Sequence, residues 1–339
     1  MQKFIYFIGI DISKQTLDFS LVQMGNQLFH LTTANNPKGI ACFIKKLKDL
    51  PGFEIKQALF CMEHTGIYNH FLLEALTSLQ ANICLQAAIQ IKYSLGLQRG
   101  KNDKIDAKRI ALYAYLKRDT LELWQPPRPV MKRLKYLVAL RNRLIRANHQ
   151  LKTALAETAH FSDKTSIKEL ATLCKSSLLS LAKDEKKATK AIEAIIKSDQ
   201  KLNHLFTLIT SVKGVGQITA TQIILSTNEF NDIKEGKKFA AYAGVVPYEH
   251  SSGSSIRGKN RTSKMANQSM KTLLHMAALC AIVHCSELKA YYERKVGEGK
   301  NKMAVINAVR NKLVLRIFAC VKNNRQYSAE YLYQATSSG

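Results

Sequence analysis

The sequence is poor in acidic residues. Its 25 Asp and Glu stand against 51 Lys and Arg in 339 residues, which gives a formal net charge of +26 and a pI of about 9.8. Such an excess is typical of proteins that bind polyanions, because each phosphate they neutralise releases condensed counterions. The basic residues are spread along the whole chain and not gathered on one amphipathic helix, which argues against a membrane-surface protein. A soluble basic protein without a polyanion partner stays as the plain alternative.

The sequence also predicts no disulfides, no membrane-spanning helix and no signal peptide. The seven cysteines are odd in number and form no CxxC pair, so we expect reduced thiols in a cytoplasmic protein. No run of about eighteen apolar residues predicts a membrane-spanning helix. The N-terminal stretch MQKFIYFIGIDISK reaches Asp11 too early for a signal peptide. Cys280, His284 and Cys285 lie in an apolar helical pattern, for which burial in helix packing is a better interpretation than a metal site.

Proline is scarce, and three of the six prolines fall in QPPRPV at 125–130, which predicts a linker. Residues 1–124 alternate strand and helix patterns. We expect strands at 4–13, 16–22, 28–33, 57–63 and 83–87, and helices at 37–49, 69–80 and 105–118. Gly25 and Asn26 are expected to form the turn before the third strand. This order predicts an α/β domain with a mixed sheet, in which an antiparallel meander is extended by parallel crossovers.

The remaining chain is predicted to be mainly helical. Residues 125–204 carry leucines at heptad-like steps, which favours a long helical hairpin or coiled coil that also serves self-association. Its basic outer faces are either simply solvated or lie against nucleic acid. Residues 205–339 are expected to form a third, mainly α domain with a Gly- and Ser-rich basic loop at 251–264.

Four acidic residues of the first domain stand out against the basic background. Asp11 lies in the first predicted strand, Glu63 ends the fourth, and Asp103 and Asp106 stand three apart at the start of the last helix. Active sites of open α/β sheets lie at the carboxyl ends of the strands, where these residues are expected to meet. Converging carboxylates bind Mg²⁺ or Mn²⁺, and two such ions can clamp a scissile phosphodiester. The alternative gives Asp103 a helix-capping role and Asp106 a favourable first-turn charge.

Two features of the third domain predict contacts with phosphate. The segment VPYEHSSGSSIRGKNRTSK at 246–264 places small and basic residues before an apolar helix, although a plain surface loop is the alternative. Its four phosphate-binding candidates are Arg257, Lys259, Arg261 and Lys264. The second feature is Gly214-Val215-Gly216, which resembles the turn of a helix-hairpin-helix, where glycines let the backbone approach a DNA phosphate. An ordinary interhelical turn is the alternative.

Several motifs together resemble one family. The stretches FIGIDISKQTLDFSLV, MEHTGIY and KNDKIDAKRIALYA are similar to the N-terminal domain of the insertion sequence 110 family of transposases. The stretches VKGVGQITATQII and FAAYAGVVPYEHSSGSSIRGKNRTSKMANQSMKTLLHMAAL resemble the family's C-terminal transposase domain. The resemblance implies a RuvC-like, RNase H-like first domain. It also implies that Asp11, Glu63, Asp103 and Asp106 are the family's acidic tetrad, with Mg²⁺ or Mn²⁺ as cofactor.

The same resemblance implies a nucleophile and partners. The family carries a nucleophilic serine immediately before a glycine, which corresponds to Ser252 before Gly253. The adjacent Ser251 is the nearest alternative position, and Tyr248 is the chemical rival, with His250 as a secondary candidate. The resemblance further implies a noncoding bridge RNA that pairs with donor and target DNA, and a dimer that pairs into a tetramer.

Two other functions remain open at this point. A metal-dependent junction resolvase or nuclease would use only the carboxylates and water, with no covalent intermediate. A nucleic-acid-binding protein with a degenerate catalytic domain would cut nothing, but the intact tetrad argues against it.

Overall fold

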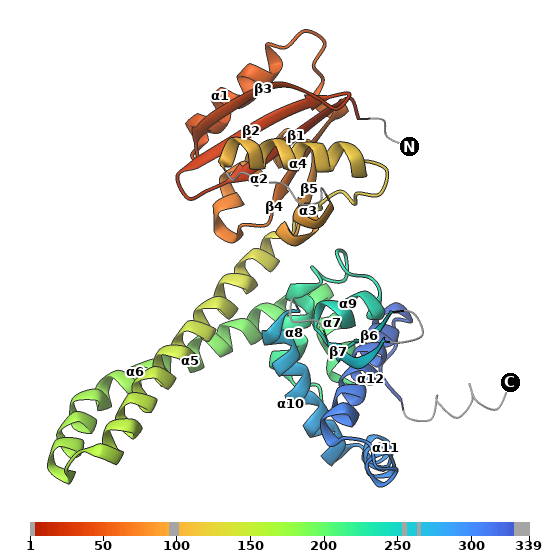
Figure 1. Cartoon of the computed structure of the whole chain (residues 1–339). Helices are drawn as coiled ribbons and strands as arrows, with labels where there is room; N and C mark the ends of the chain where they lie inside the picture. Colours follow the sequence, from red (N-terminus) through yellow and green to blue (C-terminus); the bar gives the residue numbers. More distant parts are fainter. Residues whose placement is uncertain (1–3, 95–101, 253–255, 263–265, 329–339) are drawn as a thin grey trace, which may run out of the picture. The chain divides into compact units, whose positions relative to one another are not determined.

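The computed structural model describes residues 4–94, 102–252, 256–262 and 266–328. The chain divides into two compact units, Met1–Pro126 and Pro127–Gly339 (Figure 1). The predicted division into 1–124, 125–204 and 205–339 stays a prediction, since the compact units separate at only one point.

The first unit is built on a five-stranded mixed sheet, as predicted (Figure 1). Its strands lie in the order β3-β2-β1-β4-β5, with β1 antiparallel to β2 and parallel to β4. Their bounds are Tyr6–Ile12 (β1), Thr16–Gln23 (β2), Asn26–Ala34 (β3), Ala58–Glu63 (β4) and Asn82–Gln86 (β5). The turn between β2 and β3 differs from the prediction. Met24 and Gly25 adopt positive φ there, while Asn26 already belongs to β3.

Helices cover both faces of this sheet. They are α1 (Pro37–Lys48), α2 (His70–Ser78), α3 (Ala88–Ser94) and α4 (Asp103–Lys117), with short 3₁₀ turns at Ile55–Gln57 and Gly66–Asn69. Phe43 of α1 and Leu72 of α2 pack with one face of the sheet. Ile91 of α3 and Ile110 of α4 pack with the other. The sequence prediction missed α3, whose seven residues are too short to show a helical period.

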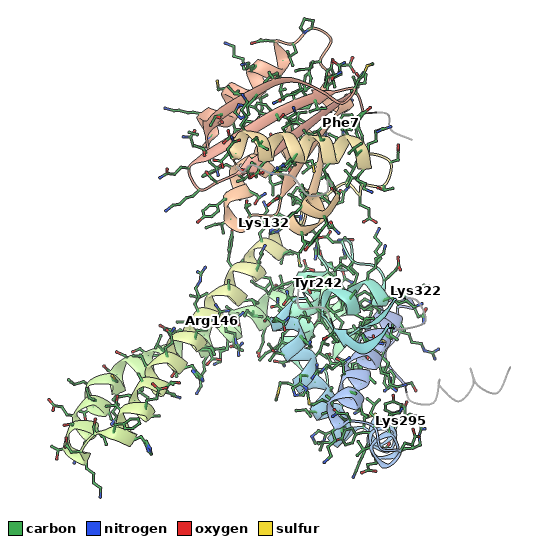
Figure 2. All side chains as sticks on the ribbon, viewed as in Figure 1. Phe7, Lys132, Arg146, Tyr242, Lys295 and Lys322 are labelled. Atoms are coloured by element: carbon green, nitrogen blue, oxygen red, sulfur yellow. The ribbon has the colours of Figure 1, made fainter. Side chains whose placement is uncertain are left out.

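The second unit begins with a long antiparallel helical hairpin, confirming that prediction (Figure 1). It consists of α5 (Pro129–Phe161) and α6 (Lys164–Ser198). Seven Lys and Arg but a single acid, Glu157, lie on α5, and Figure 2 labels two of these basic residues, Lys132 and Arg146. Not every leucine of the heptad-like series is in the seam, since Leu134 is fully buried whereas Leu140 is 45% exposed.

One ion-pair network ties the base of this hairpin to the helices that follow. The Arg128 guanidinium binds both carboxylate oxygens of Asp199 at 2.9 Å, and it also binds Glu229 at 2.6 and 2.9 Å. The Glu229 side chain is completely buried. The hydrogen bonds that Arg128 donates to Glu229, and then those to Asp199, raise the pKa of Arg128 well above its usual range. The sequence prediction assigned Arg128 only to a linker.

Six further helices and a two-stranded ribbon complete the described part of the second unit. They are α7 (Gln200–Thr210), α8 (Gln217–Ser226), α9 (Gly236–Tyr242), β6 (Pro247–Ser252), β7 (Ile256–Thr262), α10 (Gln268–His284), α11 (Ser286–Gly297) and α12 (Lys302–Lys322). The predicted burial of the Cys280 cluster is wrong, because the apolar core lies on the opposite side of α10 and leaves Cys280 and His284 exposed. Among the described residues, no single helix is long and apolar enough to cross a membrane, although α10 and α11, bent by 98°, satisfy length and composition together.

Candidate active site

The carboxyl ends of two neighbouring strands place two of the predicted acids side by side. β1 and β4 run parallel with Tyr6 opposite Ala58 and Ile10 opposite Met62. One residue further along each strand come Asp11 and Glu63. Because side chains alternate along a strand, Asp11 shares a face with Phe7 and Gly9, and this is the face that α4 covers.

Gly9 explains why α4 lies so close to β1. A Cβ added to Gly9 would lie 2.2 Å from the Ala107 carbonyl oxygen and 2.2 Å from the Ala111 nitrogen. The helix backbone therefore rests directly on the strand, which only glycine permits. Asp103 lies one turn before Ala107 on the same side of α4, so this contact brings Asp103 toward the end of β1. A glycine inside an apolar strand run was a signal of close backbone approach that the sequence prediction did not use.

The pKa of Asp11 is affected by its burial and by the three other carboxylates around it. Burial raises the pKa of Asp11 to about 6, and the negative charges of Asp103, Asp106 and Glu63 contribute to the rise. Asp106 also binds Arg109 at 2.9 Å. In the part of the chain that the structure describes, no three His, Cys, Asp or Glu side chains are arranged to hold a metal ion as they stand. The four acids therefore meet as interacting charges and not as a closed ligand shell.

The capping role considered for Asp103 belongs to its neighbour. Asn102 is the N-cap of α4, and its side-chain oxygen accepts a hydrogen bond from the Ile105 N–H at 2.8 Å. Asp103 and Asp106 both lie in the first turn, where negative charge is favourable. Since Asn102 caps the helix, the N-cap role considered for Asp103 is wrong, and a first-turn charge is the structural role that Asp103 shares with Asp106.

The segment predicted as a Gly- and Ser-rich loop is mostly an antiparallel β-ribbon. Ser251 pairs with Arg257 and Ser252 with Ile256, and Ser252 is the last residue of β6. The loop prediction failed because Gly and Ser are weak strand formers, and the cross-strand pairing that favours the ribbon leaves no local signal. Only the backbone is described for 248–252 and 256–261, and Gly253 and Lys264 lie outside the described residues. The base of the ribbon is anchored by Lys271 of α10, which donates to Thr262 at 2.9 Å.

The two glycines predicted to approach DNA differ in their surroundings. Gly214 has φ +91°, and a Cβ there would lie 2.6 Å from the Ala277 carbonyl oxygen of α10. Its conformation and its packing against α10 both require glycine. Gly216 precedes α8 and is exposed, and a Cβ added to it would meet no atom within 4 Å. Gly216 and the first turn of α8 therefore have the open approach that phosphate binding needs, whereas Gly214 has an internal structural role.

Comparison with known proteins agrees with this layout. Residues 8–160 match the family model of DEDD transposases of the IS110 type, described as a transposase. Residues 206–293 match the model described as the transposase IS116/IS110/IS902 family. The chain belongs to the IS110 family of transposases.

Some relatives of this transposase align with nearly all of it, and others with a part. A pilin gene-inverting protein of Moraxella bovis is 24% identical over 329 residues, which cover 95% of this chain and 97% of that protein. The transposase for insertion sequence element IS1111A of Coxiella burnetii is 23% identical and covers 96% and 92%. A probable family 20 transposase of Pseudomonas aeruginosa is 32% identical over 96 residues, 28% and 27% of the two chains.

A divalent cation, which DEDD transposases generally use, fits the four acids of this chain. All the candidate donors are carboxylate oxygens, the ligands that hard divalent cations prefer. Their mutual repulsion at Asp11 is the charge imbalance that a cation relieves. The sequence analysis predicted these four residues as metal ligands, which stays a prediction, and it did not foresee the contact between Gly9 and α4.

Proposed function

We propose that this transposase cuts and rejoins DNA through a covalent bond between Ser252 and a DNA phosphate. Four carboxylates hold the divalent cation, which we propose is Mg²⁺ or Mn²⁺: Asp11, Glu63, Asp103 and Asp106. The observation that carries the proposal is the convergence of these acids around Asp11, at the edge where strands β1 and β4 end. When bound, the cation offsets the negative charge of the carboxylates and of the DNA phosphate.

The proposed serine step balances as a transesterification. The Ser252 hydroxyl oxygen forms a bond to phosphorus, and the bond between phosphorus and a deoxyribose oxygen breaks. The serine loses its proton, and the leaving oxygen gains one. The phosphoserine ester keeps the energy of the broken bond, so the reverse attack by a second DNA end rejoins the strand. Positive charge for the phosphate is proposed to come from Arg257, Lys259 and Arg261 of the ribbon and from Lys264, and backbone contacts from Gly216 and the first turn of α8.

A covalent-adduct assay tests this function against its rivals. The full-length protein is incubated with labelled DNA, the element's RNA and Mg²⁺, and an SDS-resistant protein–DNA adduct is sought. Ser252→Ala should bind nucleic acid but form no adduct, and Asp11→Ala should also form none. Free cleaved ends without an adduct would indicate a nuclease that uses water. An adduct that persists in Ser252→Ala but vanishes in Ser251→Ala or Tyr248→Phe would move the nucleophile.

The partners that we propose are donor and target DNA, a noncoding bridge RNA and further copies of the chain. The net charge of +26 supports contacts with both nucleic acids. Exposed leucines on the long hairpin, 69% at Leu173 and 63% at Leu179, support self-association as a dimer that pairs into a tetramer. Mixing Ser252→Ala with Asp11→Ala tests how the copies cooperate. Recovered activity would mean that one copy supplies the serine and another the acids.

A further inference from the structure

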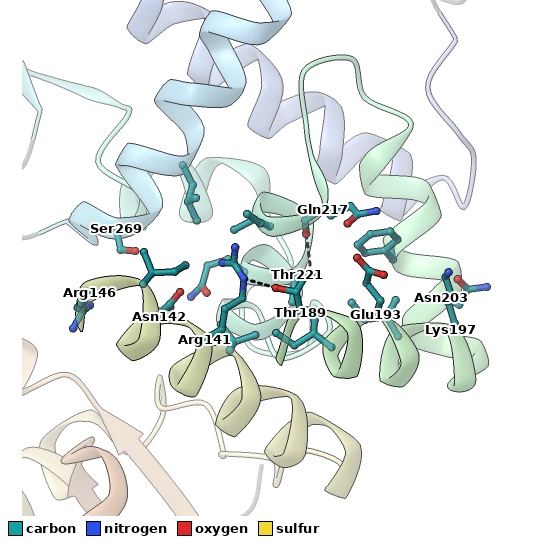
Figure 3. Close-up of a pocket in the computed structure, with 18 residues that line it drawn as sticks. Arg141, Asn142, Arg146, Thr189, Glu193, Lys197, Asn203, Gln217, Thr221 and Ser269 are labelled. Carbon is teal, nitrogen blue, oxygen red and sulfur yellow. Dashed lines mark hydrogen bonds between the residues drawn. The ribbon is translucent and has the colours of Figure 1, made fainter. Parts of the chain in front are cut away.

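A cavity of about 310 Å³ lies within the second unit, beside the base of the long hairpin (Figure 3). It is bounded by α5, α6, α7, α8 and α10. Most of its lining is apolar, and the side chains that provide this surface include Phe206, Ile218 and Leu273. Its volume is within the range of small-molecule sites. None of the residues proposed above for the serine or metal chemistry lines it.

Two polar side chains in the cavity wall make no hydrogen bonds within the described part of the protein and can bind a ligand. Asn142 and Gln222 are half-buried in its wall, and their side-chain amides make no hydrogen bond to any residue that the structure describes. An amide offers one acceptor and two donors, the pattern that pairs with the edges of nucleobases. Arg141, in contrast, is held by Thr189 at 2.9 Å and by Glu185 at 3.0 Å, so it shapes the wall.

Charge around the cavity favours a ligand with phosphates. Arg146 lies at one end with Ser269, and Lys197 lies toward the other end with Glu193 (Figure 3). Within the described ranges, neither Arg146 nor Lys197 forms an ion pair. The first turns of α8 and α10 also reach the cavity, through Gln217 and Ser269, and add the positive ends of two helix dipoles. Glu193 is the one acid in the lining, and it is suited to accept from a base amino group.

We propose that this cavity receives one unpaired base of a nucleic-acid strand, with the flanking phosphates held by Arg146 and Lys197. The apolar lining with Phe206 provides the stacking surface, and Asn142 and Gln222 bind the base edge. The inference rests on the proposed handling of nucleic acid but not on the serine or metal chemistry. It gives the long hairpin a second role, since α5 and α6 supply one wall of the site.

Oligonucleotides with and without bases test the proposal. The full-length protein is titrated with a 12-nucleotide oligo(U), the matching oligo(dU), and an abasic strand of equal length and charge. Wild type should bind the base-bearing strand roughly tenfold more tightly than the abasic strand, in line with stacking of one base. Oligo(U) against oligo(dU) shows whether RNA or DNA is the occupant. Equal binding of base-bearing and abasic strands by wild type would overturn the proposal.

A matched pair of variants locates the effect. Ile218→Glu places a charge in the cavity wall at a side chain that is 52% exposed, so the fold should tolerate it. Val283→Glu makes the same change at a 68% exposed position of α10 outside the cavity. The base-to-abasic ratio should fall to about one in Ile218→Glu and stay unchanged in Val283→Glu. The added charge weakens the binding of both strands alike, so its effect cancels in the ratio of the two affinities.

Two results would show that the cavity does not bind a base. A ratio that is unaffected by Ile218→Glu, together with a changed sedimentation coefficient, would make the cavity an interface between copies of the chain. A base-to-abasic ratio that falls to about one in both variants would also exclude the cavity as the binding site of the base. Absence of a covalent adduct with intact base discrimination would contradict the proposed chemistry alone, so the two proposals fail separately.

Discussion

Gly9 sets the distance between the strand that carries Asp11 and the helix that carries Asp103 and Asp106. We predict that Gly9→Ala destabilises the protein by about 1–3 kcal/mol or more, the usual range for overpacking, because the new methyl group meets helix backbone and not a flexible side chain. DNA cleavage should fall with it, although no acid is altered. Thermal unfolding and the cleavage rate measure the two effects.

Gly216→Ala is the control for stability, since φ is −86° there and no atom lies within 4 Å of the added carbon. Gly216 is the N-cap of α8, where alanine caps less well than glycine, so the melting temperature of Gly216→Ala should fall slightly and less than that of Gly9→Ala. An unchanged melting temperature and cleavage rate in Gly9→Ala would contradict the role given to this contact.

Asp11 makes the metal-free protein sensitive to pH. Its pKa is about 6 in the folded chain and near 3.9 when unfolded, so the folded state holds the proton more tightly. The free energy of unfolding should therefore decrease as pH rises from about 4 to about 6 and then level off. Asp11→Asn cannot ionise, and we predict that without metal it is more stable than wild type by about 1 kcal/mol at pH 8, after allowance for solvent screening.

At pH 4 this difference should vanish, because Asp11 is then protonated in the folded protein. Melting curves of both proteins in EDTA across this range provide the measurement. Addition of Mg²⁺ at pH 8 should raise the melting temperature of wild type more than that of Asp11→Asn. A constant difference between the two proteins at every pH would contradict the assigned cause.

At the scale of the secondary-structure elements, the stability of the long hairpin depends on the ion pairs at its base. Arg128 precedes α5, Asp199 separates α6 from α7, and the buried Glu229 follows α8, so one guanidinium connects three junctions. We predict that Arg128→Ala lowers the free energy of unfolding by about 3 kcal/mol, because Glu229 loses its main partner in a buried position. Lys201, at 3.6 Å from Glu229, limits the loss. Chemical denaturation measures it.

Lys187→Ala is the matched control, since Lys187 and Asp184 form an exposed pair on α6 worth less than about 1 kcal/mol. The network should also respond to acid. Hydrogen bonds from Arg128 hold the pKa of Asp199 below its usual value. Its contribution is complete above about pH 4 and is lost as the pH falls further. If Arg128→Ala and Lys187→Ala cost the same, the network does not hold the junctions.

The elements were largely predictable from the sequence, but their contacts were not. Strand and helix patterns predicted β1, β4 and α4 within a few residues, because alternation and helical spacing are local properties. The α/β pattern predicted that Asp11 and Glu63 lie at the carboxyl ends of strands, but not that those two strands are neighbours. The Gly9 contact and the Arg128 network each depend on residues far apart in the chain, whereas the ribbon β6–β7 was missed because its Gly- and Ser-rich strands have weak local strand preference. No local pattern encodes this contact or this network. The cavity beside the hairpin is likewise formed by residues from helices that are far apart in the chain.

For the molecule as a whole, the excess of basic residues makes a quantitative prediction. If the transposase neutralises six or more phosphates, its affinity for nucleic acid should fall about a thousandfold or more between 50 and 200 mM salt. Binding titrations with duplex DNA and with RNA at several salt concentrations give the slope. A nearly flat plot of log K against log salt would remove polyanion binding as the explanation of the charge of +26.

The contact between Gly9 and α4 also has a consequence for how such genes can be recombined. The glycine is encoded near the start of the gene, and Ala107 and Ala111 are encoded about a third of the way along it. A chimera joined between these two points combines a strand from one parent with a helix from another. Such a chimera keeps all four acids but assembles them only if the helix backbone still fits against the glycine. In designing hybrids of related transposases, the first strand and α4 should therefore be exchanged as one unit.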